Sequence, residues 1–430
     1  MTNQLLGVEI LPVSPWMILP FALLLLAIAV VPFLHRHWWE KHYPHVAIGL
    51  GLLVCTYYVL FLDYHRMIDT LGEYFSFIVL IGSLFIAASG IYLHTERRAT
   101  PLVNLILLAF GAVISNLLGT TGASMLLIRP FLRINRSRIR GYHVVFFIFI
   151  VSNIGGVLTP IGDPPLFLGY LNGVPFLWTL HRMWPIWLIA MLLALAVFFL
   201  VDTWSYRKWT KGQPHHDRPA RIELRGMHNL FFLMIILAAV FAKTPIREIL
   251  MIAAAAAAHR FASKAALRAN EFTWAPIKEV AILFAGIFAT MVPALDWLAL
   301  NAGRMPIRTP GQYYWTSGIL SSFLDNAPTY INFLSAAMGQ HHLTLANPEH
   351  MHMKIMLSQY PLFVQAISVG AVFFGANTYI GNGPNFMVKS IAEHHGVKCP
   401  TFFGYIACYS LPVLAPIFCL VWFIFFRNVS

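Results

Sequence analysis

Charged residues are scarce in this sequence. Only 11% of its 430 residues are Asp, Glu, Lys or Arg, whereas 58% are hydrophobic. A soluble domain needs roughly a quarter of its residues charged to cover its surface, so much of this surface must face lipid. Because one helical span uses about 20 apolar residues, the chain has room for about ten spans and for no sizeable soluble domain. The sequence therefore predicts an all-α, polytopic membrane protein.

Several chemical signatures are also missing. The four cysteines are scattered and form no CxxC pair or Cys/His metal spacing, so a disulfide framework and a zinc site are excluded. No GxxxxGK[ST] loop is present, so ATP does not drive this protein by itself. HExxH and GxSxG are absent as well. We therefore expect no enzyme, and no cofactor other than Na⁺ or H⁺ as a coupling ion.

The few charges follow a membrane pattern. The formal net charge is +12, but the basic residues lie in short loops between apolar runs, where lipid headgroups rather than nucleic acid are their partners. The apolar runs predict about ten spans, near 14–34, 45–62, 74–94, 143–180, 184–203, 228–242, 246–260, 277–298, 359–396 and 402–426, of which 143–180 and 359–396 are each broken in the middle. Two further segments, 101–133 and 312–338, are interrupted by Gly, Pro and polar residues.

The charges decide how these two interrupted segments run. Arg97 and Arg98 precede 101–133, and five arginines follow residue 128, so both ends of this segment are expected in the cytoplasm. A segment that enters and leaves on one side is a re-entrant hairpin, whose irregular backbone is tolerated where protein buries it. With 312–338 as a second hairpin from the other side, both termini lie outside a bacterial inner membrane, and most of the 29 Lys and Arg lie inside.

An internal repeat is the strongest signal. TPIGDPP (159–165) and TYIGNGP (378–384) share Thr-x-Ile-Gly-[Asp/Asn]-x-Pro, and SNLLGTTGA (115–123) occupies the place of SSFLDNAPT (321–329). Five spans per half is an odd number, so the second half is inserted upside down. The predicted organisation is a first inverted repeat at 1–203, a basic cytoplasmic linker at 204–227 and a second inverted repeat at 228–430.

Polar residues within the apolar runs cluster at the two hairpin tips and at two helix breaks. The candidate ion- or substrate-binding residues are Ser115, Asn116, Thr120, Thr121, Asn153, Thr159, Asp163, Asp325, Asn326, Thr329, Asn377, Thr378, Asn382 and Asn385. Each Ser or Thr has a plainer interpretation as a bond to a carbonyl within its own helix, and an Asp or Asn near a Pro is typical of a helix cap. An intramembrane carboxylate costs about 2.5–3.5 kcal/mol even on insertion scales. Asp163 and Asp325 are therefore the candidate Na⁺ ligands.

These motifs resemble a known group. SSFLDNAPT and GANTYIGNGPN (375–385), with SNLLGTT and TPIGDPP, are similar to the ion-transporter superfamily, which includes D-type sodium/proton antiporters, arsenite efflux pumps, citrate–metal symporters and divalent-anion/sodium symporters. The resemblance covers nearly the whole chain. It implies a homodimer, a scaffold made of the first three spans of each half, and a transport domain that moves like an elevator. Asp163 and Asp325 match acidic residues of the D-type antiporters, whereas Gly119 and Thr120 stand where those proteins carry further acids.

Three functions follow as hypotheses. The first is sodium/proton antiport, because two carboxylates lie at the predicted centre without Lys or Arg beside them. The alternative is symport of citrate or another di- or tricarboxylate with Na⁺, H⁺ or a metal, held by Asn, Thr and the half-helix N-termini at Pro164 and Pro384. The third, a passive channel or an intramembrane enzyme, fits the paired hairpins less well. The histidines of the outer loop, His341, His342, His350 and His352, are either a pH or metal sensor or a solvated loop.

Overall fold

The computed structural model of the chain describes residues 12–95, 100–210, 222–345 and 350–427. Within these residues the fold is helical apart from one two-stranded antiparallel ribbon, in which β1 (Tyr92–Thr95) pairs with β2 (Ile222–Arg225). Eight helical segments are long and apolar enough to cross a membrane, or up to nine if the bent pair formed by Met351–Gln359 and Pro361–Asn377 counts as one span. The predicted class, an all-α polytopic membrane protein, is confirmed.

The described residues of the first half form nine helical elements. They are η1 (Pro15–Ile18), α1 (Leu19–Leu34), α2 (Arg36–Phe61), α3 (Tyr64–Ser89), α4 (Pro101–Ile134), α5 (Gly141–Ile150), η2 (Ile154–Leu158), α6 (Pro164–Leu171) and α7 (Phe176–Thr210). Several begin where the sequence supplies a cap. Asp63 accepts a hydrogen bond from the amide of His65 at the start of α3, and Thr100 caps α4 just before Pro101.

The second half contains more and shorter helical elements. Its elements are α8 (His228–Ala239), α9 (Ile246–Phe261), α10 (Lys264–Ala269), α11 (Ala275–Asn301), η3 (Ala302–Arg304), α12 (Pro310–Ser321), α13 (Asn326–Gln340), α14 (Met351–Gln359), α15 (Pro361–Phe374), η5 (Gly375–Asn377), α16 (Gly383–His394), α17 (Phe402–Tyr405), η6 (Ile406–Leu414) and α18 (Ala415–Phe425). Of the predicted linker 204–227, residues 204–210 extend α7 and 222–225 form β2, while 211–221 lie outside the described residues.

Helix α4 turns back on itself. Gly119 has φ +74° and ψ 155°, a conformation that essentially only glycine adopts. The side chains of Asn104 and Asn135 exchange hydrogen bonds of 2.9 and 2.8 Å, although 31 residues of straight helix would separate them by roughly 46 Å. Both ends of α4 therefore lie together. The second interrupted segment does the same, since Tyr313 Oη on α12 donates to Gln340 Oε1 at the end of α13, at 3.1 Å.

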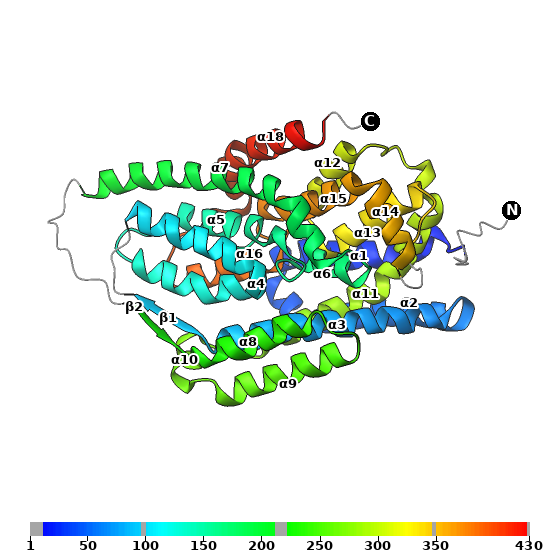
Figure 1. Cartoon of the computed structure of the whole chain (residues 1–430), viewed down its shortest axis with the longest axis horizontal. Helices are drawn as coiled ribbons and strands as arrows, with labels where there is room; N and C mark the ends of the chain where they lie inside the picture. The colour runs from blue at the N-terminus through cyan, green and yellow to red at the C-terminus, as the bar shows by residue number, and fades with distance from the viewer. Residues whose placement is uncertain (1–11, 96–99, 211–221, 346–349, 428–430) are drawn as a thin grey trace.

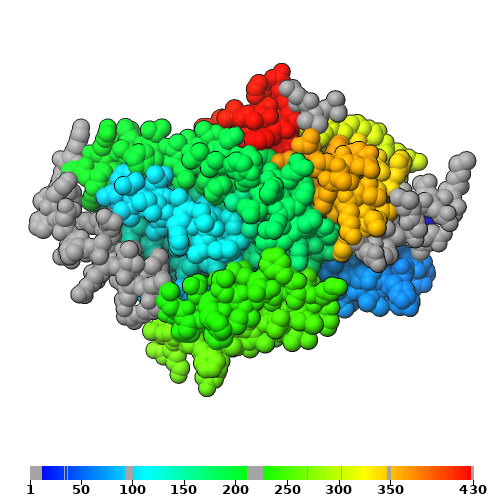
Figure 2. Space-filling view, in the orientation of Figure 1, coloured from blue at the N-terminus to red at the C-terminus, as the bar shows by residue number. Residues whose placement is uncertain are grey.

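The two halves interlock. Helix α13 of the second half packs against α6 of the first, and α16 of the second half packs against α4 of the first. Figure 1 shows α4 and α5 between α7 on one side and α3 with α8 on the other, in agreement with the contacts of α4 with both α3 and α7. Helices α8 and α9 protrude at the lower edge of the molecule (Figure 2). Each hairpin is thus enclosed by elements of both halves.

Candidate ion-binding site between the two hairpins

Asp163 lies where both hairpins and both helix breaks meet. Its Oδ1 accepts hydrogen bonds from Thr120 Oγ1 at 2.6 Å and from Asn382 Nδ2 at 3.0 Å, and its Oδ2 accepts one from Asn326 Nδ2 at 2.5 Å. All four side chains are buried. Thr120 comes from the tip of the first hairpin, Asn326 from the tip of the second, and Asn382 from the break before α16. The structure thus brings together one candidate residue from each of the four predicted clusters.

The internal repeat relates these four residues in pairs. The alignment that places SNLLGTTGA over SSFLDNAPT sets Thr120 opposite Asn326, and the two Thr-x-Ile-Gly motifs set Asp163 opposite Asn382. A residue that contacts its own counterpart lies close to the axis that relates the two repeats. The Asp163–Asn382 hydrogen bond is therefore the contact that the predicted inverted repeat would place at its axis, and transporters of that kind have their sites at the repeat interface.

The charge of Asp163 has no basic partner within the described chain. Its three hydrogen-bond donors are neutral, and Asn326 Oδ1 is buried with no hydrogen-bond partner among the described residues. A cavity of about 30 Å³ lies beside Asp163 and Thr120. Because one water-sized probe needs roughly 10–15 Å³, this space fits a water molecule or a small ion and is too small for a tricarboxylate. A bound cation or a proton would balance the buried carboxylate.

The two candidate carboxylates differ in their environment. Asp325 is half-buried, and its Oδ1 accepts a hydrogen bond from the amide of Ala327 at 3.0 Å, as a cap of α13 does. Asp163 precedes α6 but makes no such cap bond with its side chain. The cap interpretation therefore describes the geometry of Asp325, whereas the oxygens of Asp163 are directed to donors from three other segments.

Asn116 and Thr159 join the first hairpin to the first helix break. Asn116 Nδ2 donates to the carbonyl of Gly155 at 2.7 Å, and Thr159 Oγ1 donates to the carbonyl of Asn116 at 2.6 Å. The amide of Thr120 donates to the carbonyl of Gly162 at 2.7 Å. These bonds satisfy backbone groups that the break leaves without helical partners, and they hold Thr120 next to Asp163.

Corresponding hydrogen bonds join the second hairpin to the second helix break. Thr378 Oγ1 donates to the carbonyl of Ser322 at 2.5 Å, as Thr159 does to Asn116, and Asn377 Nδ2 donates to Ser322 Oγ at 3.0 Å. Ser322 is the residue that the repeat places opposite Asn116. In each half, the Thr of the Thr-x-Ile-Gly motif therefore joins the helix break to the hairpin by a corresponding hydrogen bond.

The remaining candidates lie around this centre. Asn153 Nδ2 donates to Asn385 Oδ1 at 2.8 Å, which joins the two breaks directly. Ser115 and Thr329 are buried and bond to carbonyls of their own segments, the ordinary role of such residues. Thr121 lines the small cavity beside Asp163.

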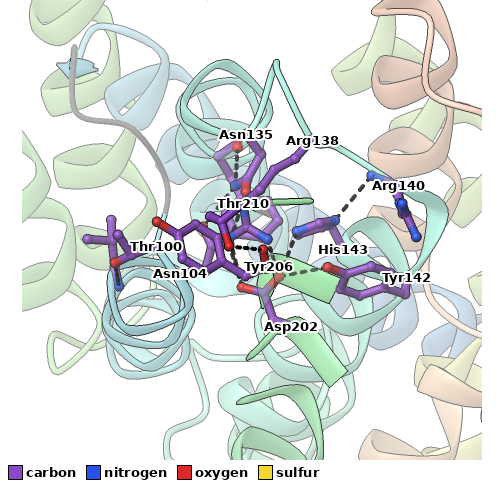
Figure 3. Close-up of polar contacts among 12 residues, drawn as sticks. Thr100, Asn104, Asn135, Arg138, Arg140, Tyr142, His143, Asp202, Tyr206 and Thr210 are labelled. Carbon is purple, nitrogen blue, oxygen red and sulfur yellow. Dashed lines mark hydrogen bonds and ion pairs between the residues drawn. The ribbon is translucent and has the colours of Figure 1, made fainter. Parts of the chain in front are cut away.

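The base of the first hairpin carries a buried ionic cluster that the sequence motifs did not reveal. Asp202 on α7 accepts hydrogen bonds from Arg138 Nη2 at 2.9 Å, Tyr142 Oη at 2.6 Å and Asn104 Nδ2 at 2.9 Å (Figure 3). His143 Nε2 lies 3.2 Å from Asp202 Oδ1. Asp202 is fully buried at the end of an apolar run. An isolated acid in such a run is the sequence feature that could have indicated this cluster.

The outer-loop histidines give no sign of a metal centre. His352 Nδ1 accepts a hydrogen bond from the amide of Thr344 at 3.0 Å, and the ring of His341 stacks on Tyr360 with 3.6 Å between centroids. Burial lowers the pKa of His341 and of His350. No group of three or more His, Cys, Asp or Glu residues that could hold a metal ion occurs within the described residues.

Comparison with known families yields one match. The model of a family described as "Putative citrate transport" matches residues 11–426, nearly the whole chain. No curated protein matches the chain significantly.

Proposed function

The chain belongs to the family described as "Putative citrate transport", and from this premise we propose that it is a secondary active transporter that moves a citrate-like carboxylate together with a cation. The observation that carries the proposal is the Asp163 cluster, in which three neutral donors surround a buried carboxylate that has no basic partner in the part of the chain that the structure describes. Such a group holds its charge when it binds a cation and loses it when it binds a proton. Asp163 is therefore the coupling-ion site of this proposal.

The carboxylate would be bound by neutral groups beside this centre. The helices α6 and α16 begin at Pro164 and Gly383, next to the two breaks, and helix N-termini favour anionic groups. Asn and Thr side chains of the hairpin tips supply further donors. In this proposal the hairpins and the broken helices move as one body against the first three spans of each half, within a homodimer. Residues 129–140 face the cytoplasm.

Sodium/proton antiport remains a second candidate. It is favoured by the cavity of about 30 Å³ at Asp163, which suits an ion and excludes a tricarboxylate. In that case the same carboxylate would exchange H⁺ for Na⁺ without an organic substrate.

One proteoliposome experiment separates the two. Labelled citrate uptake is measured with an inward Na⁺ gradient, with a pH gradient and with neither, and a pH dye reports H⁺ release on addition of Na⁺ to the same vesicles. We expect gradient-dependent citrate uptake. Dye dequenching by Na⁺ without citrate, together with no citrate uptake, would replace the symport proposal by antiport.

A further inference from the structure

A second, larger cavity leads away from the Asp163 cluster. Its volume is about 280 Å³, and its walls come from the end of α3, the second arm of α4, residues 270–279 and α16. It shares the lining residues Phe85 and Gly122 with the small cavity beside Asp163. Its size is close to the lower end of the range of small-molecule sites, roughly 300–1,000 Å³. The loops at its outer end belong to the face predicted to be cytoplasmic.

The wall of this cavity contains a guanidinium group with unused donors. Arg129 is only 5% exposed, and its Nη2 donates to Glu271 Oε2 at 3.0 Å. Its Nε and Nη1 have no hydrogen-bond partner among the described residues. Buried donors of a charged group are rarely left unsatisfied, because the loss of hydration is costly. Nε and Nη1 are both enclosed, so a ligand in the cavity reaches the guanidinium through the Nη2 that Glu271 now occupies. An anionic ligand fits this position, since the planar fork of a guanidinium matches a carboxylate.

The present partner of Arg129 can be displaced. The side chain of Glu271 is 68% exposed, and it stands on the short turn between α10 and α11. Ion pairs with an exposed partner contribute little to stability, so Glu271 can swing into solvent while another carboxylate takes its place.

The other carboxylate of the wall limits the ligand. Glu279 also lines the cavity, and it would repel an anion that approached it directly. A hydroxycarboxylate avoids this repulsion when a carboxylate faces Arg129 and a hydroxyl donates to Glu279. The cavity therefore suits a di- or tricarboxylate that carries a hydroxyl group better than a simple inorganic anion.

We propose that this cavity is a second substrate site, in which Arg129 binds a carboxylate of a hydroxycarboxylate after displacing Glu271, between the predicted cytoplasmic face and the Asp163 cluster. The assignment rests on the proposed carboxylate transport. Because the cavity lies between the predicted cytoplasmic face and the Asp163 cluster, it receives substrate from the cytoplasmic side.

The test uses this sidedness. Citrate transport is measured in right-side-out and inside-out vesicles for wild type, R129Q, R129K and E271Q, with R133Q as the control. Arg133 lies one turn further along α4, and its side chain bonds to Tyr92 and to the carbonyl of Arg129. We expect R129Q to raise the KM for citrate about tenfold or more at the cytoplasmic face alone. R129K should have a different, intermediate effect, because lysine keeps the positive charge but lacks the planar guanidinium fork. E271Q should lower this KM. R133Q leaves both values near wild type.

Two results would overturn the proposal: an equal change of KM at both faces in R129Q, or unchanged KM in both R129Q and E271Q. If wild type transports no carboxylate at all, the proposed function fails, yet the site is still testable. Calorimetric titration of purified wild type and R129Q with citrate then decides it, since citrate binding that is lost in R129Q supports the site and binding that R129Q leaves unchanged refutes it.

Discussion

Replacement of Asp163 by Asn separates charge from packing at the centre of the molecule. The oxygen of the new amide can still accept from Thr120 and Asn382, which both donate to Oδ1. The new NH₂ would face Asn326 Nδ2, now 2.5 Å from Oδ2. Asn326 can rotate its amide so that Oδ1, which has no partner in the described structure, accepts from this NH₂. We therefore expect D163N to fold and to insert normally.

The expected loss is in ion coupling. Two unit charges about 4 Å apart attract by about 4 kcal/mol at an effective dielectric constant of 20, and each 1.4 kcal/mol corresponds to tenfold in affinity. Since the amide oxygen keeps part of this attraction, we expect the apparent affinity for the coupling cation to fall roughly a hundredfold. The assay is substrate flux in proteoliposomes as a function of Na⁺ concentration and of pH, with protein content checked by quantitative blotting.

Asp325 supplies the matched comparison. Asn caps a helix about as well as Asp, and the carboxylate of Asp325 makes a cap bond to the amide of Ala327. If capping is the whole role of Asp325, D325N should keep most of its transport activity. If both carboxylates bind the ion, D325N should lose ion coupling as D163N does. Flux close to wild type in D163N, under saturating Na⁺ and across pH 6–9, would refute the ion-site reasoning and move the proposal to the Asn and Thr side chains.

Three further predictions concern stability. G119A should lower the free energy of unfolding in detergent by about 1–3 kcal/mol, because alanine avoids the φ of +74° at the hairpin tip; an unchanged melting temperature would contradict this. D202N should lower the free energy of unfolding by about 3–5 kcal/mol, since it removes the buried carboxylate to which Arg138, Tyr142 and Asn104 donate, and the same melting assay measures it. Hydrogen bonding and the charge of Arg129 lower the pKa of Glu271 below 4.5, so the pair stabilises the folded state above this pH and its contribution is lost as the pH falls through the lowered pKa. E271Q should thus be slightly less stable than wild type, by less than about 1 kcal/mol. This difference in stability should be equal at pH 6 and pH 8 and should vanish in strong acid. A difference that changes between pH 6 and pH 8 would exclude this account.

Hydropathy and charge were sufficient to predict the helical membrane class and the approximate position of most spans, but not the short helices α10 and α14. Apolar runs set the helix bounds, because each span must satisfy its backbone internally. The same reasoning misplaced the end of α7, which continues to Thr210 into the predicted linker. Polar residues at a helix end carry no hydropathy signal for where the helix stops.

The candidate site could be predicted from the sequence because its residues lie in repeated motifs. The Thr-x-Ile-Gly pattern identified Asp163 and Asn382 in both halves, and the structure joins them by a hydrogen bond. Sequence alone could not distinguish the cap geometry of Asp325 from the cluster geometry of Asp163, because local sequence contains no information on donors 160 or more residues away. The pairing of Asp202 with Arg138 and of Arg129 with Glu271 could not be predicted for the same reason, because these partners come from distant segments.

The interlocking of the two halves has a consequence for biosynthesis. Asp163 is translated well before Asn326 and Asn382, and α6 leaves the ribosome long before α13, the helix that covers it. The first half must therefore wait in the bilayer with an incompletely covered hairpin and a carboxylate that lacks two of its three donors. Completion of the Asp163 cluster is therefore a late step of biosynthesis, and a chain truncated before residue 326 should be recognised by membrane quality control as unfinished.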